Sequence, residues 1–377
     1  MQSPFFDPSK TYDENDSAGP FNGFADGVDL RDSTSEPKFN FLGYKIHTPF
    51  GIPSGPLLNS KYCKGAFEKG FDVIHYKTRR SGTFPCNPFP NVVFLRIDED
   101  LTLQRAKKTI IGDTNPPSDP TKFSITNSFG NPSPDPTVWQ EDMKKALSFE
   151  GRGQLLIGSA VGTIREGFSE EDYWNDFALT AKLAAETGVK VIEVNLSCPN
   201  VASEGILCFS KEAVVAVCRK SKEAIGDKPL LVKFGYFSKD QQELLETIMK
   251  DISPFIAGVC AINTIPAPVI DEDGNQILPG PGRLMAGICG ASIKWAGLDM
   301  VKRLNQIKEK LNLNFAIIGV GGVMNPEDYF EYKKLGADVV QSATGAMWNT
   351  NLAKQIKEKE KAKAEILAGL DPVQLVG

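Results

Sequence analysis

One of the seven cysteines, Cys198, stands where its thiol could take part in a reaction. It lies in the segment Asn195-Leu-Ser-Cys-Pro-Asn200, directly after an apolar run that we expect to be a strand. A free thiol has a pKa of about 8.5, so nearby positive charge can convert it to thiolate. A thiolate in such a loop can serve as a general base or as a nucleophile, and the residues leave both roles open. Cys218 and Cys260 are expected to be inert packing residues.

Two lysines are embedded in runs that are otherwise largely apolar. Lys77 follows Val-Ile-His-Tyr, and Lys233 stands within Leu-Leu-Val-Lys-Phe. A buried lysine must face an anionic group or give up its charge. We therefore expect both lysines to face an anionic ligand, with a Schiff-base nucleophile as the alternative for Lys233. The neighbouring Arg79 and Arg80 are expected to be solvated loop residues.

Asparagines and glycines supply further candidate groups. A side-chain amide both donates and accepts hydrogen bonds, so several of them suit a flat heterocycle such as a pyrimidine. The four candidates are Asn127, Asn195, Asn200 and Asn263. Gly321 and Gly322 would let backbone amides approach a phosphate closely, and a helix is expected to start soon after them. The sequence therefore predicts a site for a heterocycle and a phosphate.

These residues follow or stand within short apolar runs. Eight such runs alternate with segments of helical period, which is typical of β/α units around a parallel sheet. The runs span residues 50–54, 72–77, 155–161, 191–196, 230–234, 258–263, 316–320 and 339–343. They predict an α/β fold, a (β/α)8 TIM barrel, in which functional residues gather at the carboxyl ends of the strands. A doubly wound sheet is the alternative.

Helix caps and long insertions separate the runs. The residues expected to begin helices are Ser169, Ser210, Ser238 and Asn325, and those expected to end them include Gly188, Gly226 and Gly336. Two longer segments, about 81–150 and 265–290, are rich in proline or turn residues. They predict long loop insertions at the C-terminal face of the barrel.

The composition limits the class of protein. The net charge of −5 argues against a nucleic-acid binder, and no apolar run is long enough for a membrane span. The cysteines form no Cys-x-x-Cys pair and there are two histidines, so we expect no metal and a reducing, cytoplasmic setting. Residues 1–38 are expected to form a loose or surface-wrapping acidic arm rich in Pro, Gly and Ser. A barrel domain over 39–377, ending in a helix, would follow.

The motifs together resemble the dihydroorotate dehydrogenase family over about residues 40–350. The most specific motif is Asn195-Leu-Ser-Cys-Pro-Asn200. Supporting segments are Ser54-Gly55, Tyr76-Lys77-Thr78, Asn127-Ser-Phe-Gly130, Val232-Lys233, Ile262-Asn263-Thr264, Cys289-Gly290-Ala-Ser-Ile-Lys294, Ile318-Gly-Val-Gly-Gly322 and Gln341-Ser-Ala-Thr344.

The resemblance implies FMN as cofactor and oxidation of dihydroorotate to orotate in de novo pyrimidine biosynthesis. Cys198 would remove the proton from C5 while a hydride passes from C6 to flavin N5. The catalytic residues would be Cys198, Lys77 and Lys233. The substrate would be held by Asn127, Ser128, Phe129, Gly130, Asn195, Asn200, Asn263 and Thr264. The flavin would be held by Ser54, Gly55, Lys77, Thr78, Asn195, Lys233, Asn263, Gly290, Gly321, Gly322, Ala343 and Thr344.

Cysteine at position 198 resembles the soluble class of the family, whose members need no membrane partner. The electron acceptor would be fumarate or a separate NAD-linked iron–sulfur subunit, with the single-subunit type preferred. A homodimer is expected. Two departures are that Ala343 stands where many members have glycine, and that Trp295 replaces a common proline.

Three rival interpretations remain open. A dihydropyrimidine-oxidising enzyme, acting on dihydrouracil, would share the barrel, the flavin and the cysteine base, although Asn200 favours orotate. A Schiff-base aldolase would use Lys233 as its nucleophile. A barrel that has lost catalysis would only bind a ligand.

Overall fold

The computed structural model describes residues 4–197 and 207–369, and its centre is a closed barrel of eight parallel strands. The strands in barrel order are β3 (Phe50–Ile52), β4 (Val73–His75), β8 (Leu155–Ala160), β9 (Val191–Asn195), β10 (Leu230–Phe234), β11 (Gly258–Ala261), β14 (Ala316–Val320) and β15 (Val339–Gln341). Each expected run contains one of them, and β15 pairs with β3 to close the ring. The barrel is therefore confirmed and the doubly wound sheet is wrong.

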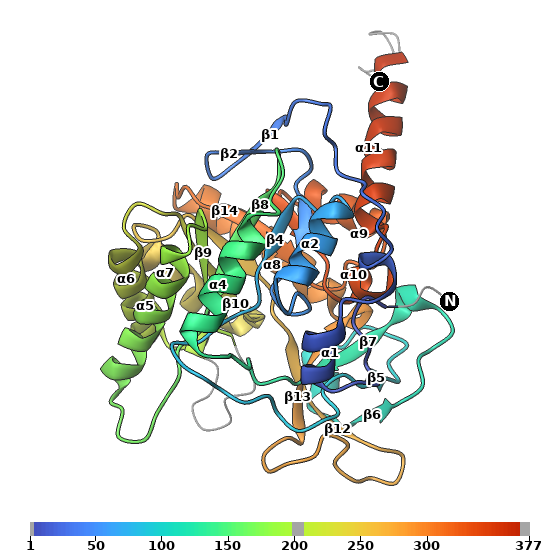
Figure 1. The fold of residues 1–377 in the computed structure, drawn as a ribbon. Helices are drawn as coiled ribbons and strands as arrows, with labels where there is room; N and C mark the ends of the chain where they lie inside the picture. Colours follow the sequence, from blue (N-terminus) through green and yellow to red (C-terminus); the bar gives the residue numbers. More distant parts are fainter. Residues whose placement is uncertain (1–3, 198–206, 370–377) are drawn as a thin grey trace.

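Helices surround the barrel in the expected alternation (Figure 1). They are α2 (Ser60–Glu68), α4 (Pro136–Leu147), α5 (Glu170–Glu186), α6 (Lys211–Ile225), α7 (Gln242–Ile252), α8 (Lys294–Lys310), α9 (Pro326–Lys334), α10 (Thr344–Trp348) and α11 (Leu352–Gly369). Ser169, Ser210 and Asn325 cap α5, α6 and α9 through their side chains, as expected. Ser238 precedes a short 3₁₀ turn, Lys239–Gln241, which leads into α7.

The barrel interior changes from apolar to polar along its axis. Alternate residues of a barrel strand face inward. Near one end these residues are apolar and cluster with Phe41 and Ile46 of the hairpin β1 (Phe39–Phe41) and β2 (Tyr44–Ile46), and they include Val73, Ile157, Val191, Leu231 and Val339. Two residues further along the same strands, the buried side chains are polar, namely His75, Ser159, Glu193, Lys233 and Gln341. The polar layer therefore lies toward the carboxyl ends of the strands.

The two long insertions are not simply loops. They form a second, small sheet that closes on itself, made of β5 (Phe94–Leu95), β6 (Ile110–Asp113), β7 (Ser124–Asn127), β12 (Ile265–Ile270) and β13 (Met285–Gly290). β7 pairs antiparallel with β13, which follows it by more than 150 residues in the sequence. Local sequence does not reveal these strands, because each is short and its partner is distant in the chain. This sheet lies at the opposite end of the molecule from the β1–β2 hairpin (Figure 1).

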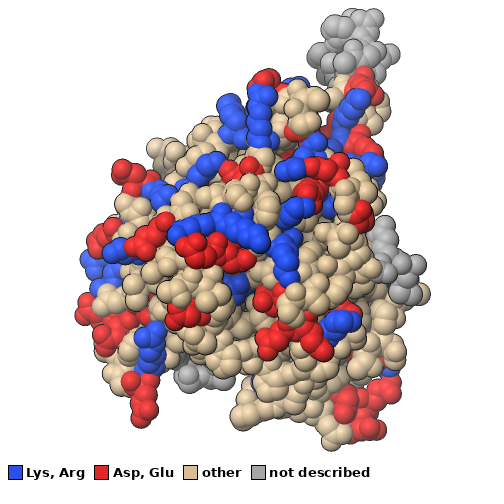
Figure 2. Space-filling view, in the orientation of Figure 1, with Lys and Arg blue, Asp and Glu red and all other residues tan. Residues whose placement is uncertain are grey.

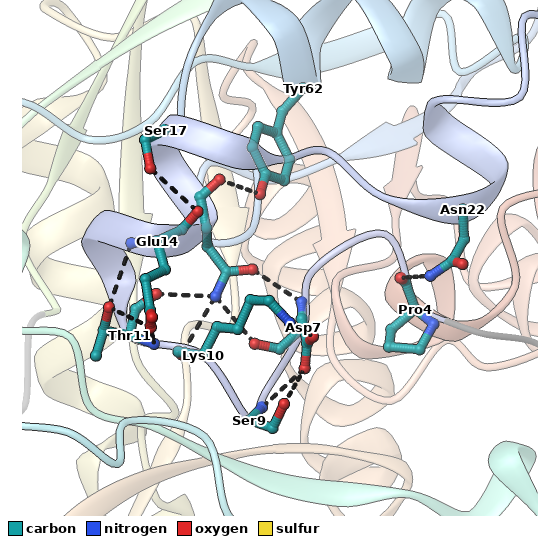
Figure 3. Close-up of polar contacts among 10 residues, drawn as sticks. Pro4, Asp7, Ser9, Lys10, Thr11, Glu14, Ser17, Asn22 and Tyr62 are labelled. Carbon is teal, nitrogen blue, oxygen red and sulfur yellow. Dashed lines mark hydrogen bonds and ion pairs between the residues drawn. The ribbon is translucent and has the colours of Figure 1, made fainter.

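The N-terminal segment is packed on the barrel. Phe5 and Phe6 are buried, and the amide of Phe5 donates to the carbonyl of Met347 in α10. The short helix α1 (Tyr12–Ala18) begins with a capping box of Thr11 and Glu14. Figure 3 shows this box and the side chain of Asn22, which donates to the carbonyl of Pro4 at 2.6 Å. The described part of the arm is thus ordered and surface-wrapping; its separation from the barrel domain at residue 38 stays a prediction.

Charged side chains of both signs are interspersed on the face of the molecule drawn in Figure 2. Lysine and arginine side chains alternate there with aspartate and glutamate. Short-range pairs account for part of this pattern, for example Lys64 with Glu68 at 2.5 Å within α2. Such exposed pairs contribute little to stability.

Candidate active site

A cavity opens at the carboxyl ends of the barrel strands. Its walls come from loops after most of the eight strands and from the small sheet. Sixteen residues predicted for the site line this cavity: Ser54, Gly55, Lys77, Thr78, Asn127, Phe129, Gly130, Asn195, Lys233, Asn263, Thr264, Gly290, Gly321, Gly322, Ala343 and Thr344. The structure thus gathers groups from distant segments, while their individual roles stay predictions.

Three predicted residues are not among the lining. Cys198 and Asn200 lie outside the described residues. Ser128 is buried beside the cavity, where its hydroxyl accepts a hydrogen bond from Arg283 at 3.0 Å. The lining also includes residues that the prediction missed: Pro53, Asn131, Cys289, Ile293, Val320, Val323 and Met324. Several of these residues adjoin predicted site residues in the sequence, and this adjacency is the signal by which they could have been found.

The two lysines reach the cavity from different strands. The Lys77 ammonium donates to the carbonyl of Gly55 at 2.7 Å and lies 4.9 Å from the centre of the Phe129 ring. Lys233 is 5% exposed and faces the interior beside Glu193. Burial raises the pKa of Glu193, but the charges of His75 and Lys233 outweigh burial and lower the pKa to about 2. Glu193 is therefore a carboxylate at neutral pH.

A pair of asparagines anchors the chain that leads toward residue 198. The side-chain oxygen of Asn195 accepts from the amide of Ser197 at 3.1 Å and from the side chain of Asn263 at 3.3 Å. Asn263 also donates to the carbonyl of Ser197. These bonds fix both amide groups at the cavity wall. They also fix the described chain as far as Ser197.

Buried polar atoms and glycines suit the binding of a polar, flat ligand with a phosphate. Thr264 and Thr344 line the cavity, and their side-chain oxygens are buried and have no hydrogen-bond partner among the residues that the structure describes. Gly290, Gly321 and Gly322 have positive φ values of 102°, 132° and 64°. A Cβ at Gly290 would lie 2.1 Å from the carbonyl oxygen of Phe123. These features suit a cofactor that has a polar ring and a phosphate, as FMN does.

The expectation that Arg79 and Arg80 are solvated loop residues is wrong, because both side chains are buried. The Arg80 guanidinium donates to the carbonyls of Gly130 and Asn131 at 3.2 and 2.9 Å. It also donates to the carbonyl of Gly162 at 2.8 Å. The insertion after β4 folds back over the barrel and supplies these carbonyls, which local sequence does not reveal. Arg80 therefore holds a loop that forms part of the cavity wall.

The cysteines of the described part of the chain make poor bases. Burial raises the pKa of each of these thiols, which are Cys63, Cys86, Cys208, Cys218, Cys260 and Cys289. Cys289 lines the cavity, yet burial raises its pKa to about 11. Cys218 and Cys260 are fully buried, as expected. None of the six would be a thiolate near neutral pH.

The family model described as dihydroorotate dehydrogenase matches residues 38–363. The chain belongs to the dihydroorotate dehydrogenase family. Dihydroorotate dehydrogenase of Dictyostelium discoideum is 35% identical over 361 residues, covering 94% of this chain and 96% of that protein. A crystal structure of dihydroorotate dehydrogenase from Eimeria tenella in complex with ferulenol has a TM-score of 0.66 at 16% identity. It covers 90% of this chain and 88% of the other, and supports the fold.

Dihydroorotate dehydrogenases are flavin oxidoreductases of pyrimidine biosynthesis, and FMN is the family's cofactor. The relatives do not separate the two soluble types. Dihydroorotate dehydrogenase A (fumarate) of Lactobacillus helveticus is 27% identical over 82% of this chain and 95% of that protein. The catalytic subunit of dihydroorotate dehydrogenase B (NAD(+)) of Methanocaldococcus jannaschii is also 27% identical, over 63% of this chain and 71% of that protein.

Within residues 4–197 and 207–369, no helix combines the length and apolar character needed to cross a membrane. In the same residues, no group of three His, Cys, Asp or Glu side chains could hold a metal ion.

Proposed function

We propose that this chain oxidises dihydroorotate to orotate with FMN bound in the cavity at the barrel mouth. The observation that carries this proposal is the meeting of Lys77, Lys233, Asn127, Asn195 and Asn263 in one cavity of a dihydroorotate dehydrogenase chain. Cationic groups suit the charge of a reduced flavin and of a substrate carboxylate. Side-chain amides suit the alternating C=O and N–H groups of the pyrimidine.

The residues of the cavity divide into two groups, those that would hold FMN and those that would hold dihydroorotate. Gly321, Gly322 and Thr344 would hold the phosphate of FMN, and Ser54, Gly55 and Gly290 would line its ring. When bound, FMN supplies the acceptor for the hydride that leaves C6 of dihydroorotate. Lys233 holds positive charge in the polar layer of the barrel, where it lowers the free energy of the reduced state. The amides of Asn127, Asn195, Asn200 and Asn263 would orient the substrate, with Thr264 beside them.

Cys198 is the general base of this proposal. Its thiolate takes the proton from C5 of dihydroorotate as the hydride leaves C6, so that the C5–C6 double bond of orotate forms. Two observations support this role. The six other cysteines have raised pKa values, and the chain that leads to residue 198 is anchored at the cavity by Asn195 and Asn263. Cys198 itself lies outside the described residues.

We further propose fumarate as the electron acceptor, a homodimer, and a cytoplasmic setting. Fumarate is supported by the 82% coverage of this chain by the L. helveticus fumarate enzyme, against 63% for the M. jannaschii catalytic subunit. The reducing setting is supported by the free thiols of all six cysteines in the described residues.

The substrate can be tested by turnover. The purified protein, loaded with FMN, should oxidise dihydroorotate with fumarate as acceptor and leave dihydrouracil largely unchanged. The amide-rich wall explains this preference if Asn200 and its neighbours contact the substrate carboxylate. Oxidation of dihydrouracil alone would contradict the proposal and support the dihydropyrimidine alternative.

The base can be tested by substitution. Cys198→Ala should keep FMN bound and lower kcat by about 10²-fold or more, the low end of general-base contributions. Cys218→Ala is the matched control, because Cys218 is buried in α6 away from the cavity, and it should keep full turnover. Unchanged turnover in Cys198→Ala would remove Cys198 from the mechanism.

A further inference from the structure

A row of hydrogen-bonded side chains runs from the cavity wall into the barrel interior. The hydroxyls of Ser54 and Thr78 lie 2.9 Å apart, and those of Thr78 and Ser159 lie 3.0 Å apart. The hydroxyl of Ser159 donates to the carboxylate of Glu193 at 3.0 Å. Ser54 and Thr78 line the cavity, whereas Ser159 and Glu193 are fully buried beneath it. The row joins the segments that follow β3 and β4 to strands β8 and β9, below the candidate flavin site.

The carboxylate gives this row a direction. An ionised carboxylate only accepts hydrogen bonds, so Ser159 must donate its single proton to Glu193. The oxygen of Ser159 is then the acceptor for Thr78, and the oxygen of Thr78 is the acceptor for Ser54. Each hydroxyl has one proton, so the proton of Ser54 points toward Thr78. Ser54 is left with its lone pairs facing the cavity.

Neighbouring charges keep Glu193 ionised. The Nδ1 atom of His75 lies 3.3 Å from the Glu193 carboxylate, and both side chains are fully buried. Lys233 on the adjacent strand β10 is also close enough to stabilise the negative charge. A buried carboxylate with such partners is held as an anion. The orientation of the hydroxyls is therefore fixed over the neutral range of pH.

We propose that Glu193, acting through Ser159 and Thr78, fixes Ser54 as a hydrogen-bond acceptor for an N–H group of the bound flavin ring. This inference rests on the proposed function, because it takes FMN as the occupant of the cavity. Ser159 and Glu193 are positioning residues, since neither lines the cavity. Without the carboxylate, a serine hydroxyl could donate or accept, and Ser54 would not discriminate between N–H and C=O groups.

A double-mutant cycle on FMN affinity tests the row. Ser54→Ala should weaken FMN binding about fivefold to tenfold, because an N–H of the ligand loses its acceptor. Ser159→Ala should weaken binding about threefold, although it touches no ligand, because the hydroxyls of Thr78 and Ser54 become free to reverse. The double variant should bind FMN within about twofold of Ser54→Ala, since the effect of Ser159 passes through Ser54.

The control is Ser221→Ala, which removes another fully buried serine hydroxyl, in α6, that has no hydrogen-bond partner in the described part of the chain. It should leave FMN affinity unchanged. The visible absorption maximum of bound FMN should shift in the same direction in Ser54→Ala and Ser159→Ala and stay fixed in the control. Independent, multiplied losses of affinity in the double variant, or wild-type affinity in Ser159→Ala, would overturn the inference.

Two further measurements keep the test decisive. If Ser159→Ala fails to fold, Glu193→Gln replaces the carboxylate at the far end of the row by an amide of similar volume that can also donate, and it should show the same lack of additivity with Ser54→Ala. Failure of the proposed function would look different, because the wild-type protein would then bind no FMN or show no reduction by dihydroorotate. Normal reduction of the wild type together with additive losses in the variants would reject only this inference.

Discussion

At the scale of single residues, the site depends on a few backbone positions as much as on its polar side chains. Gly322 has a φ of +64°, and a Cβ there would lie 2.7 Å from the backbone nitrogen of Lys294, at the start of α8. Gly226 has the same φ of +64°, but a Cβ there would meet nothing within 4 Å. Comparing an alanine substitution at each of these two glycines therefore separates the effect of an unfavourable backbone conformation from the effect of a steric clash.

We predict that Gly322→Ala weakens FMN binding by about tenfold or more, because the backbone next to the phosphate position must move. Gly226→Ala should lose only stability, about 1–3 kcal/mol, because a φ of 64° with a ψ of −131° lies outside the regions that L residues readily adopt. Fluorescence titration with FMN and thermal unfolding of both variants measure the two effects. Equal FMN affinity in the two variants would show that Gly322 has no part in FMN binding.

Residue types alone predict much of the site. Where they fail, the reason is physical, because the deciding contacts come from distant parts of the chain. Lys233 and Lys77 were recognisable because a lysine in an apolar run needs a reason to be there. Arg80 was misjudged because its acceptors, including the carbonyl of Asn131, come from an insertion that folds back over the barrel. The sequence does not single out Ser159 and Glu193, because their role arises only from the hydrogen bond between them, which joins two strands.

At the scale of elements, the barrel strands and most helix caps followed from local patterns. The small sheet did not, because β12 and β13 find their partners β6 and β7 across more than 150 residues. The N-terminal arm was only partly predicted. Its few aromatic residues are spaced without helical or strand period, yet Phe6 packs edge-on against Phe129, with ring centres 5.6 Å apart.

The arm should therefore stabilise the cavity wall, since Phe129 lines the cavity. Phe6 is 2% exposed, and we predict that Phe6→Ala lowers the free energy of unfolding by about 3–5 kcal/mol and weakens FMN binding. The matched control, Phe39→Ala, removes a ring that is 40% exposed and should cost about 0.5 kcal/mol or less. Urea unfolding of both variants measures the free energy of unfolding. Equal losses in the two variants would mean that the arm does not stabilise the cavity wall.

At the scale of the whole molecule, closure of the barrel creates the site. Ser54 and Thr344 are 290 positions apart, yet pairing of β15 with β3 places both at the same cavity. The β1–β2 hairpin closes one end with apolar side chains, and the small sheet forms part of the wall at the other. The polar layer between them holds Lys233 and Glu193 beneath the position proposed for the flavin.

The most direct test of the proposed activity is anaerobic addition of dihydroorotate to the FMN-loaded protein, followed in the visible spectrum. The proposal predicts that the oxidised flavin band is lost in proportion to the dihydroorotate added, with orotate as product. It also predicts that fumarate restores the band. A band that persists with excess dihydroorotate, or a colourless protein in which borohydride traps a ligand on Lys233, would contradict it.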